Sequence, residues 1–166
     1  MPKLTGFWIY LNTFEKSQFM EFHFDTIKQS RKYVATIVGK LNNEQLNCIP
    51  PGFKNNIGWH LLHLVVTEQL LCYRLSGLPC SVSEEWIDRF MKGTAPTEII
   101  DNTLVQDALD HLIKQPEQLR DDYHRGIFKN YSSYTTSADV TLNSIEDAIV
   151  FNTFHEGIHL GIMLQL

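Results

Sequence analysis

The segment from about Asn55 to Ser76 constrains the fold more than any other, because it is apolar on nearly every side. A helix over this segment presents tryptophan, leucine, valine and tyrosine in most directions, and such a helix is stable when protein surrounds it. Asparagine is a favoured N-cap, and Gly77 and Pro79 end the helix. The rest of the chain must therefore supply the elements that cover it.

Three further segments carry apolar residues at helical spacing: about Ser17 to Leu41, Asn102 to Tyr123, and Leu142 to Leu166. Pro116 falls inside one of them and should kink that helix. The sequence shows no sustained alternation of apolar and polar residues and no Asn-Gly or Asp-Gly hairpin signal, so Lys129 to Thr141 is predicted to be a loop. Four long helices with polar breaks predict an all-α four-helix bundle.

Composition and charge are those of an ordinary soluble domain. At 166 residues the chain is long enough to bury a full core without disulfides. Its net charge of -5 is mild and scattered, which argues against a nucleic-acid partner or a membrane partner. The three cysteines form no CxxC pair, and no run reaches the roughly 18 apolar residues of a membrane span. We expect a cytoplasmic protein of one domain, residues 1–166, with residues 1–16 as an extension that packs its aromatic side chains on the domain.

The connection between residues 77 and 102 is longer than two packed helices require. It contains one short helical stretch, Ser83 to Phe90, in which Ser83 can act as the N-cap and Trp86 and Phe90 can pack inward. Long ordered connections often build binding surfaces. We expect this one to border a functional site, with Trp86 and Arg89 near its mouth.

The last helix carries His155 and His159 four residues apart, so both side chains project from one face. That face is otherwise apolar, and burying two imidazoles there is costly unless their nitrogens are used. The second helix carries another pair, His60 and His63, on its main polar strip. Two histidine clusters on two buried helices favour a metal site with one ligand from the second helix and two from the last. Helical spacing does not choose between His60 and His63, and the alternative is that all four are hydrogen-bonded core residues.

The segment from His155 to His159 also matches the H-E-x-x-H pattern of zinc metalloproteases, in which Glu156 would be the general base. No strand-built substrate cleft is expected in this chain, which argues against a peptidase. Gly157 and Gly161 have the spacing that lets another helix approach closely.

Two stretches of the chain together resemble a known family, the DinB/YfiT-like metal-dependent hydrolases. The first resembles the second helix of that family and reads Asn56-Ile57-Gly58-Trp59-His60-Leu61-Leu62-His63-Leu64, followed by Glu68 and Leu75-Ser76-Gly77. The second resembles the family's carboxy-terminal HxxxH-x-G motif and reads His155-Glu156-Gly157-Ile158-His159-Leu160-Gly161. The motifs stand in the expected order, and the resemblance covers roughly residues 17–166.

The resemblance implies a bundle of up-down-down-up topology with one divalent metal ion held by three histidines. In the family pattern the second-helix ligand follows two apolar residues and precedes leucine, so the implied ligands are His63, His155 and His159. Zinc and nickel are the favoured metals, with iron and cobalt as alternatives. Four other residues are candidates for contacts to the ligands or to a substrate: His60, Glu68, Asn152 and Trp59.

The wider superfamily includes thiol-dependent enzymes, among them mycothiol-dependent maleylpyruvate isomerase and bacillithiol transferases. The resemblance therefore implies a metal-dependent enzyme, either a thiol S-transferase or a hydrolase, with a small-molecule substrate such as a low-molecular-weight thiol. The alternative is a non-catalytic, stress-related module that binds a metal or ligand, because the sequence places no carboxylate firmly beside the histidines. The apolar first helix and the N-terminal aromatic residues would permit a homodimer.

Overall fold

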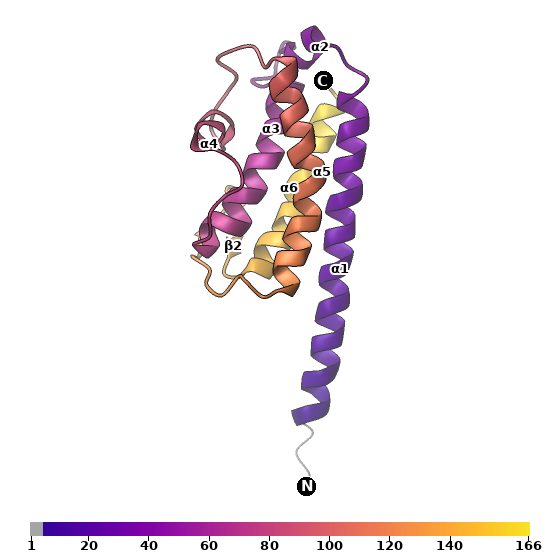
Figure 1. Ribbon diagram of the computed structural model, residues 1–166, viewed down its shortest axis with the longest axis vertical. Coiled ribbons are helices and arrows are strands. Elements are labelled where there is room, and N and C mark those ends of the chain that lie inside the picture. The colour runs from indigo at the N-terminus through magenta and orange to yellow at the C-terminus, as the bar shows by residue number, and fades with distance from the viewer. Residues whose placement is uncertain (1–4) are drawn as a thin grey trace.

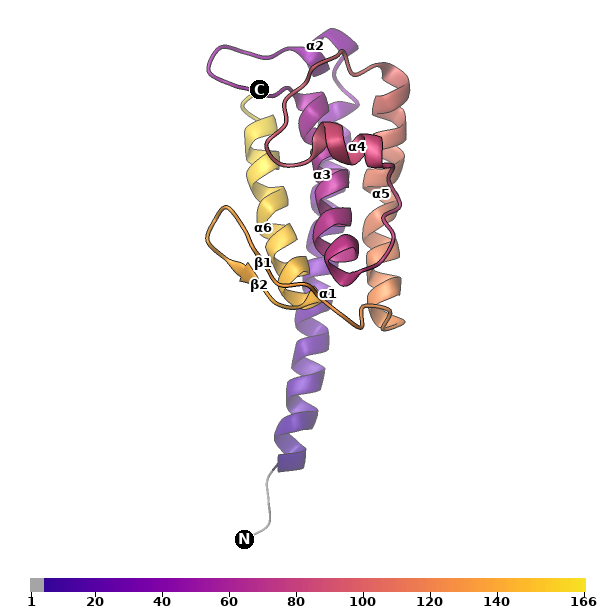
Figure 2. The ribbon, with the colours of Figure 1, turned by 90° about the vertical axis from the view of Figure 1, so that its left-hand side faces the viewer.

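The computed structural model describes the backbone of residues 5–166 and the side chains from residue 15 onward. Four long helices dominate it: α1 (Thr5–Val38), α3 (Ile57–Glu68), α5 (Asn102–His124) and α6 (Ile145–Met163). Helix α1 packs against α5 and α6, and α3 packs against the same two helices (Figures 1 and 2). The predicted all-α class is confirmed. In the part of the chain that the structure describes, no helix is long and apolar enough to cross a membrane.

Hydrogen bonds between the connections show how the long helices run. Asn47, which follows α1, accepts a bond from the N-cap Asn56 of α3 and donates one to the carbonyl of Ile100, just before α5. Helices α3 and α5 therefore begin at the end of the bundle where α1 finishes. At the opposite end, Tyr123 near the end of α5 bonds to Glu146 at the start of α6. Helices α1 and α6 thus run in one direction and α3 and α5 in the other (Figure 1).

Helix α3 is as enclosed as its composition predicts, with eleven of its twelve residues buried. The side chain of Asn56 accepts a hydrogen bond from the backbone N–H of Trp59, which caps the helix. A π-helical turn, η1 (Gln69–Tyr73), and a 3-10 turn, η2 (Arg74–Ser76), extend it to Gly77. Gly77 has a φ of 72°, a left-handed conformation that glycine adopts readily and that ends the helix as expected.

Among the described residues, the connections hold two short helices and one hairpin besides η1 and η2. Helix α2 (Asn43–Asn47) follows α1, and helix α4 (Glu84–Phe90) lies in the long connection after α3, with Ser83 as its N-cap as predicted. The stretch predicted as a loop contains an antiparallel hairpin of β1 (Tyr134–Thr135) and β2 (Thr141–Leu142). The loop prediction was wrong there because each strand has only two residues, and the turn uses Asp139 at a φ of 58° without a following glycine.

Helix α1 is longer than its sequence pattern indicates. We expected it to run from about Ser17 to Leu41, and it runs from Thr5 to Val38. No proline interrupts residues 5–16, so a helix nucleated on the bundle can extend along them at one hydrogen bond per residue. Figure 1 shows α1 continuing well past the ends of the other helices. The expected packing of the N-terminal aromatic side chains falls outside the side chains that the structure describes.

Candidate metal centre

Helices α3 and α6 bring three histidines together at their contact. His63, His155 and His159 each offer one ring nitrogen, and these three atoms lie within 4.8 Å of one another. The Nε2 atoms of His63 and His155 are 3.2 Å apart. The spacing of four residues on α6 places its two rings on one face, with centroids 4.4 Å apart.

His63 is held in one orientation by two neighbours. Its Nδ1 lies 2.6 Å from the carbonyl oxygen of Phe90, the last residue of α4, and a carbonyl there has no partner further along the helix. A carbonyl only accepts, so Nδ1 carries the proton and Nε2 presents a lone pair toward His155. The ring of Trp59 stacks on His63 at 4.4 Å and an interplanar angle of 14°. A fixed tautomer with a backbone partner on the second nitrogen is characteristic of metal-binding histidines.

His60 is attached to the cluster through His159. The Nδ1 atoms of the two rings are 2.8 Å apart, so one of them donates a hydrogen bond to the other. In either arrangement Nε2 of His159 takes no part in that bond. The structure therefore places His60 beside the cluster of three and does not include it in the group whose nitrogens converge.

All four histidines are uncharged at neutral pH. Burial, followed by the charges of neighbouring histidines, lowers the pKa of His60 to about 4, of His155 to about 3 and of His159 to about 2. Burial also lowers the pKa of His63, although the Phe90 carbonyl opposes this. Neutral imidazoles have the free lone pairs that a metal ion needs. The Nδ1 of His155 is buried without a hydrogen-bond partner, so this nitrogen of the cluster is free to bond to another group.

The cluster forms one wall of a cavity of about 650 Å³. Its lining is largely apolar, with Leu70 and Leu71 from η1, Met91 from the connection after α4, and Phe151 and Ile158 from α6. Tyr134, Thr136 and Ser137 of the hairpin region also contribute to the lining. The charged residues among the lining are both basic, Arg74 and Lys92. The long connection expected to border a site thus contributes to it, although Trp86 and Arg89 do not line the cavity.

Two residues expected near the cluster lie elsewhere. Glu68 and Asn152 do not line the cavity, and both are fully buried in the bundle around Arg31. The guanidinium of Arg31 lies 3.0 Å from Glu68 Oε2 and 2.8 Å from Glu156 Oε1, and Asn152 donates to the same oxygen of Glu156 at 3.2 Å. The reason is helical phase, since Glu156 and Asn152 occupy the side of α6 that faces the core. Glu156 is therefore not placed as the base of a metalloprotease.

The sequence interpretation missed Arg31 of α1, which it did not single out. Arg31 is completely buried and also donates to Gln115 Oε1 at 3.0 Å and to the carbonyl of Leu112 at 3.4 Å. Leu112 precedes Pro116 by four residues in α5, and proline has no N–H to donate to the Leu112 carbonyl. Arg31 donates a hydrogen bond to that carbonyl instead. Arg31 lies on the same face of α1 as the core residues Ile27 and Val34, and this spacing could have predicted its burial.

Fold and site together define a class, the helical bundles that carry a histidine cluster on the wall of a cavity. The model of the DinB superfamily matches residues 26–163, so the chain belongs to this superfamily. Among solved structures it is similar to a conserved protein from Enterococcus faecalis, with a TM-score of 0.62 over 87% of this chain and 92% of that one. At 12% identity, this likeness shows the fold alone. No curated protein matches the chain.

Proposed function

We propose that this protein is a divalent-metal-dependent enzyme in which His63, His155 and His159 hold one ion. The observation that carries the proposal is the convergence of three neutral imidazole nitrogens within 4.8 Å at the wall of a cavity. Two nitrogens bound tetrahedrally to one zinc ion at 2.0–2.1 Å lie about 3.3 Å apart. The separation of 3.2 Å between Nε2 of His63 and Nε2 of His155 fits that requirement.

Three protein ligands leave a position for water or substrate, which is the arrangement of catalytic rather than structural sites. Zinc and nickel suit the ligand set, with iron and cobalt as alternatives. When bound, such an ion supplies Lewis acidity that lowers the pKa of a coordinated water or thiol. The chain's own residues fix the ligands: the Phe90 carbonyl and Trp59 orient His63, and His60 orients His159. Thr67 places its hydroxyl 3.3 Å from Nε2 of His63, where it can bond to a group held beside that nitrogen.

The cavity lining favours a small substrate with an apolar body and an anionic group. Leucine, methionine and phenylalanine form most of the lining, and its charged members are Arg74 and Lys92. A low-molecular-weight thiol meets both needs, because its thiolate is a good ligand for zinc and its remaining charges can be negative. We therefore propose thiol S-transfer as the reaction, with hydrolysis by a metal-bound water as the alternative of the same class.

One observation favours a second candidate, a binding module without turnover. No carboxylate lines the cavity among the residues that the structure describes, and Glu68 and Glu156 are both engaged with Arg31. A transferase can work without such a base, because a bound metal ion would lower the pKa of the thiol enough to give the thiolate. A hydrolase commonly uses a base.

The test is turnover by the metal-loaded protein. Loaded separately with zinc and nickel, it should consume thiols in the presence of an aryl halide or epoxide, and the activity should be lost in His155→Ala. The matched control is His111→Ala, since His111 packs against Trp86 away from the cavity. Metal-loaded protein that binds thiols but neither transfers them nor hydrolyses esters would support the binding module instead.

A further inference from the structure

The histidine cluster lies partway along the cavity and divides it into two ends. Helices α3 and α6 run in opposite directions (Figure 1), and His63 faces His155 across their contact. On α3 the cavity lining includes Trp59, four residues before His63, and Thr67, four residues after it. At about 1.5 Å of rise per residue, these two positions lie about 6 Å along the helix on either side of His63. The lining continues from Thr67 as far as Leu75, so the cavity has room for a ligand on each side of the cluster.

The end beyond Thr67 is lined mainly by apolar side chains. Phe151 of α6 belongs to this end, because it precedes His155 by one turn and α6 runs antiparallel to α3. Leu71 is part of a hydrophobic core cluster, and Leu75, Tyr134 and Phe151 pack against that cluster. We call this end the apolar lobe, and its apolar lining consists of Leu70, Leu71, Leu75, Tyr134 and Phe151.

Two hydrogen bonds hold the hairpin region against the apolar lobe. The hydroxyl of Tyr131 donates to the carbonyl of Leu71 at 3.0 Å, and the N–H of Ser132 donates to the carbonyl of Leu75 at 2.6 Å. Leu71 lies in the π turn η1 and Leu75 in the 3-10 turn η2. Single π turns within helices occur frequently at functional sites. The apolar lobe is therefore formed by elements that are fixed to one another.

The connection after α4 covers the other end of the cavity. Phe90, the last residue of α4, contacts His63 through its carbonyl. Four residues later, the hydroxyl of Thr94 accepts a hydrogen bond from Nε1 of Trp59 at 3.1 Å. The segment between them, which includes Lys92, therefore passes from His63 toward the Trp59 side of the cluster.

The two basic residues of the lining differ in their surroundings. Arg74, which lies beside the apolar lobe, forms an ion pair with Glu84. Lys92 is exposed, and no carboxylate lines the cavity beside it among the residues that the structure describes. The positive charge available to a ligand is therefore that of Lys92. We call this end the basic lobe, and its lining includes Trp59, Lys92 and Ile162.

We propose that the apolar lobe binds the second substrate of the reaction, an uncharged electrophile with an apolar body such as a benzylic halide. This inference rests on the proposed function, because it places the thiol in the basic lobe and its reaction partner in the apolar lobe. The anionic group of the thiol is attracted by Lys92. The ring of the electrophile is removed from water by the leucine side chains. The two substrates then approach the cluster from opposite ends of the cavity and meet there.

The reaction at this meeting point is the displacement of a halide. The thiol gives up its proton to solvent, and an electron pair of the thiolate sulfur forms a bond to the benzylic carbon. The carbon–halogen bond breaks, and the halide leaves with that bond's electron pair. The products are a thioether, a halide ion and a proton. The apolar lobe contributes by holding the reacting carbon beside the cluster.

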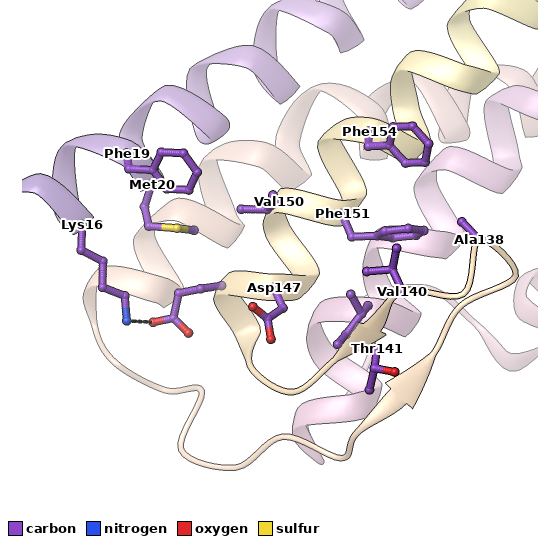
Figure 3. Close-up of a pocket in the computed structure, with 12 residues that line it drawn as sticks. Lys16, Phe19, Met20, Ala138, Val140, Thr141, Asp147, Val150, Phe151 and Phe154 are labelled. Atoms are coloured by element: carbon purple, nitrogen blue, oxygen red, sulfur yellow. Dashed lines mark ion pairs between the residues drawn. The ribbon is translucent and has the colours of Figure 1, made fainter.

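Phe151 limits the length of the electrophile. Its side chain lines the apolar lobe and also a separate apolar groove of about 740 Å³ on the outside of the bundle. Figure 3 shows this groove, with Phe151 and Val140 of the hairpin among the residues that line it. Phe151→Ala should open the lobe into the groove. The ratio of kcat/KM for 4-butylbenzyl chloride to kcat/KM for benzyl chloride should then rise by roughly 10-fold, because a butyl group gains apolar burial.

Nuclear magnetic resonance of the full chain, with and without added zinc, tests the subsite independently of turnover. Propylbenzene, an unreactive probe, should give nuclear Overhauser effects to the methyl groups of Leu71 and Leu75 and none to those of Ile162. Leu70→Trp fills the apolar lobe and should abolish these effects. Ile162→Trp, at the other end of the cavity, should keep them. Effects at Ile162 alone, equal effects at both ends, or no effect at either end would overturn the proposal.

Kinetics of the zinc-loaded protein test the assignment of the two lobes. Leu70→Trp should lower kcat/KM for benzyl chloride by about 10-fold or more and leave the Kd for the thiol unchanged. Ile162→Trp should raise the Kd for the thiol. The matched control is Ile113→Trp, because Ile113 is exposed on α5 and does not line the cavity, and it should behave as the wild type. All three variants should keep the circular dichroism spectrum of the wild type.

The two experiments separate failure of this inference from failure of the proposed function. Turnover with the probe bound at the Ile162 end would refute only the assignment of the lobes. Binding of the probe in the apolar lobe without turnover of any electrophile would refute the transferase, and the electrophile with it.

Discussion

Replacing Arg31 with methionine should destabilise the bundle severely, although it changes no residue of the cavity. The Arg31 side chain reaches all three other long helices, through Glu68 of α3, Gln115 and the Leu112 carbonyl of α5, and Glu156 of α6. Methionine keeps much of the apolar volume and removes the charge. Two buried carboxylates then lose the cation between them.

The expected loss is about 4 kcal/mol, because removing one partner of a buried ion pair typically costs 3–5 kcal/mol. For a domain of this size each kcal/mol lowers Tm by roughly 2–4 °C, so the melting temperature should fall by about 12 °C. Urea denaturation followed by circular dichroism, on protein freed of metal by a chelator, measures the loss without a contribution from metal binding.

The loss should also depend on pH. Burial raises the pKa of Glu68 from 4.5 to about 7, and Arg31 opposes that rise, so the pKa should be higher still in Arg31→Met. A raised folded-state pKa gives a stabilising contribution that is complete below the unfolded value and is lost as pH rises through the folded value. In the wild type, the contribution of Glu68 is already lost once the pH exceeds its folded-state pKa of about 7. In Arg31→Met the folded-state pKa is higher, so this contribution continues to fall above pH 7. Its deficit should therefore be larger at pH 8.5 than at pH 6.

The control is a variant that removes all three charges, Arg31→Met with Glu68→Gln and Glu156→Gln. It should recover much of the lost stability, because uncharged groups of similar size no longer carry an uncompensated buried charge. A cost below about 1 kcal/mol for Arg31→Met alone, equal at both pH values, would be that of an ordinary surface change and would refute the buried network.

Three further perturbations test the site. Ser83→Ala removes the N-cap of α4, whose last carbonyl orients His63, and should cost about 1 kcal/mol in urea denaturation and weaken zinc binding in a chelator competition. Lys92→Ala should raise the Kd of the metal-loaded protein for an anionic thiol more than for its neutral amide, measured by titration calorimetry. The lowered pKa values of His155 and His159 mean that zinc binding at pH 7 should release few protons from the ligands, which calorimetry in buffers of different ionisation enthalpy detects.

The sequence was sufficient for the features that depend on local spacing. The apolar circumference of α3, the Ser83 cap and the glycine end at Gly77 each follow from a few neighbouring residues, and the structure shows all three. The phase of His155 and His159 on α6 is likewise a property of one helix. Their meeting with His63 depends on how two helices pack, and the family resemblance indicated that pairing where periodicity did not choose.

The features that the sequence did not reveal depend on partners far along the chain. Arg31 is a charged residue whose burial becomes favourable only because Glu68 and Glu156 converge on it from two other helices. Helical phase places Glu156 on the core side of α6, but its pairing with Arg31 there depends on how α1 packs and is not encoded in a pattern such as H-E-x-x-H. The short hairpin at residues 134–142 depends on a turn at Asp139 that has no distinctive residue pair.

Metal content tests the central claim most directly, by elemental mass spectrometry on the wild type, His63→Ala, His155→Ala, His60→Ala and the control His111→Ala. After reconstitution, the wild type should hold close to one equivalent of zinc or nickel, and His60→Ala and His111→Ala should retain it. His63→Ala and His155→Ala should lose it. A wild type that takes up no divalent metal, or full retention in both ligand variants, would contradict a metal centre at His63, His155 and His159.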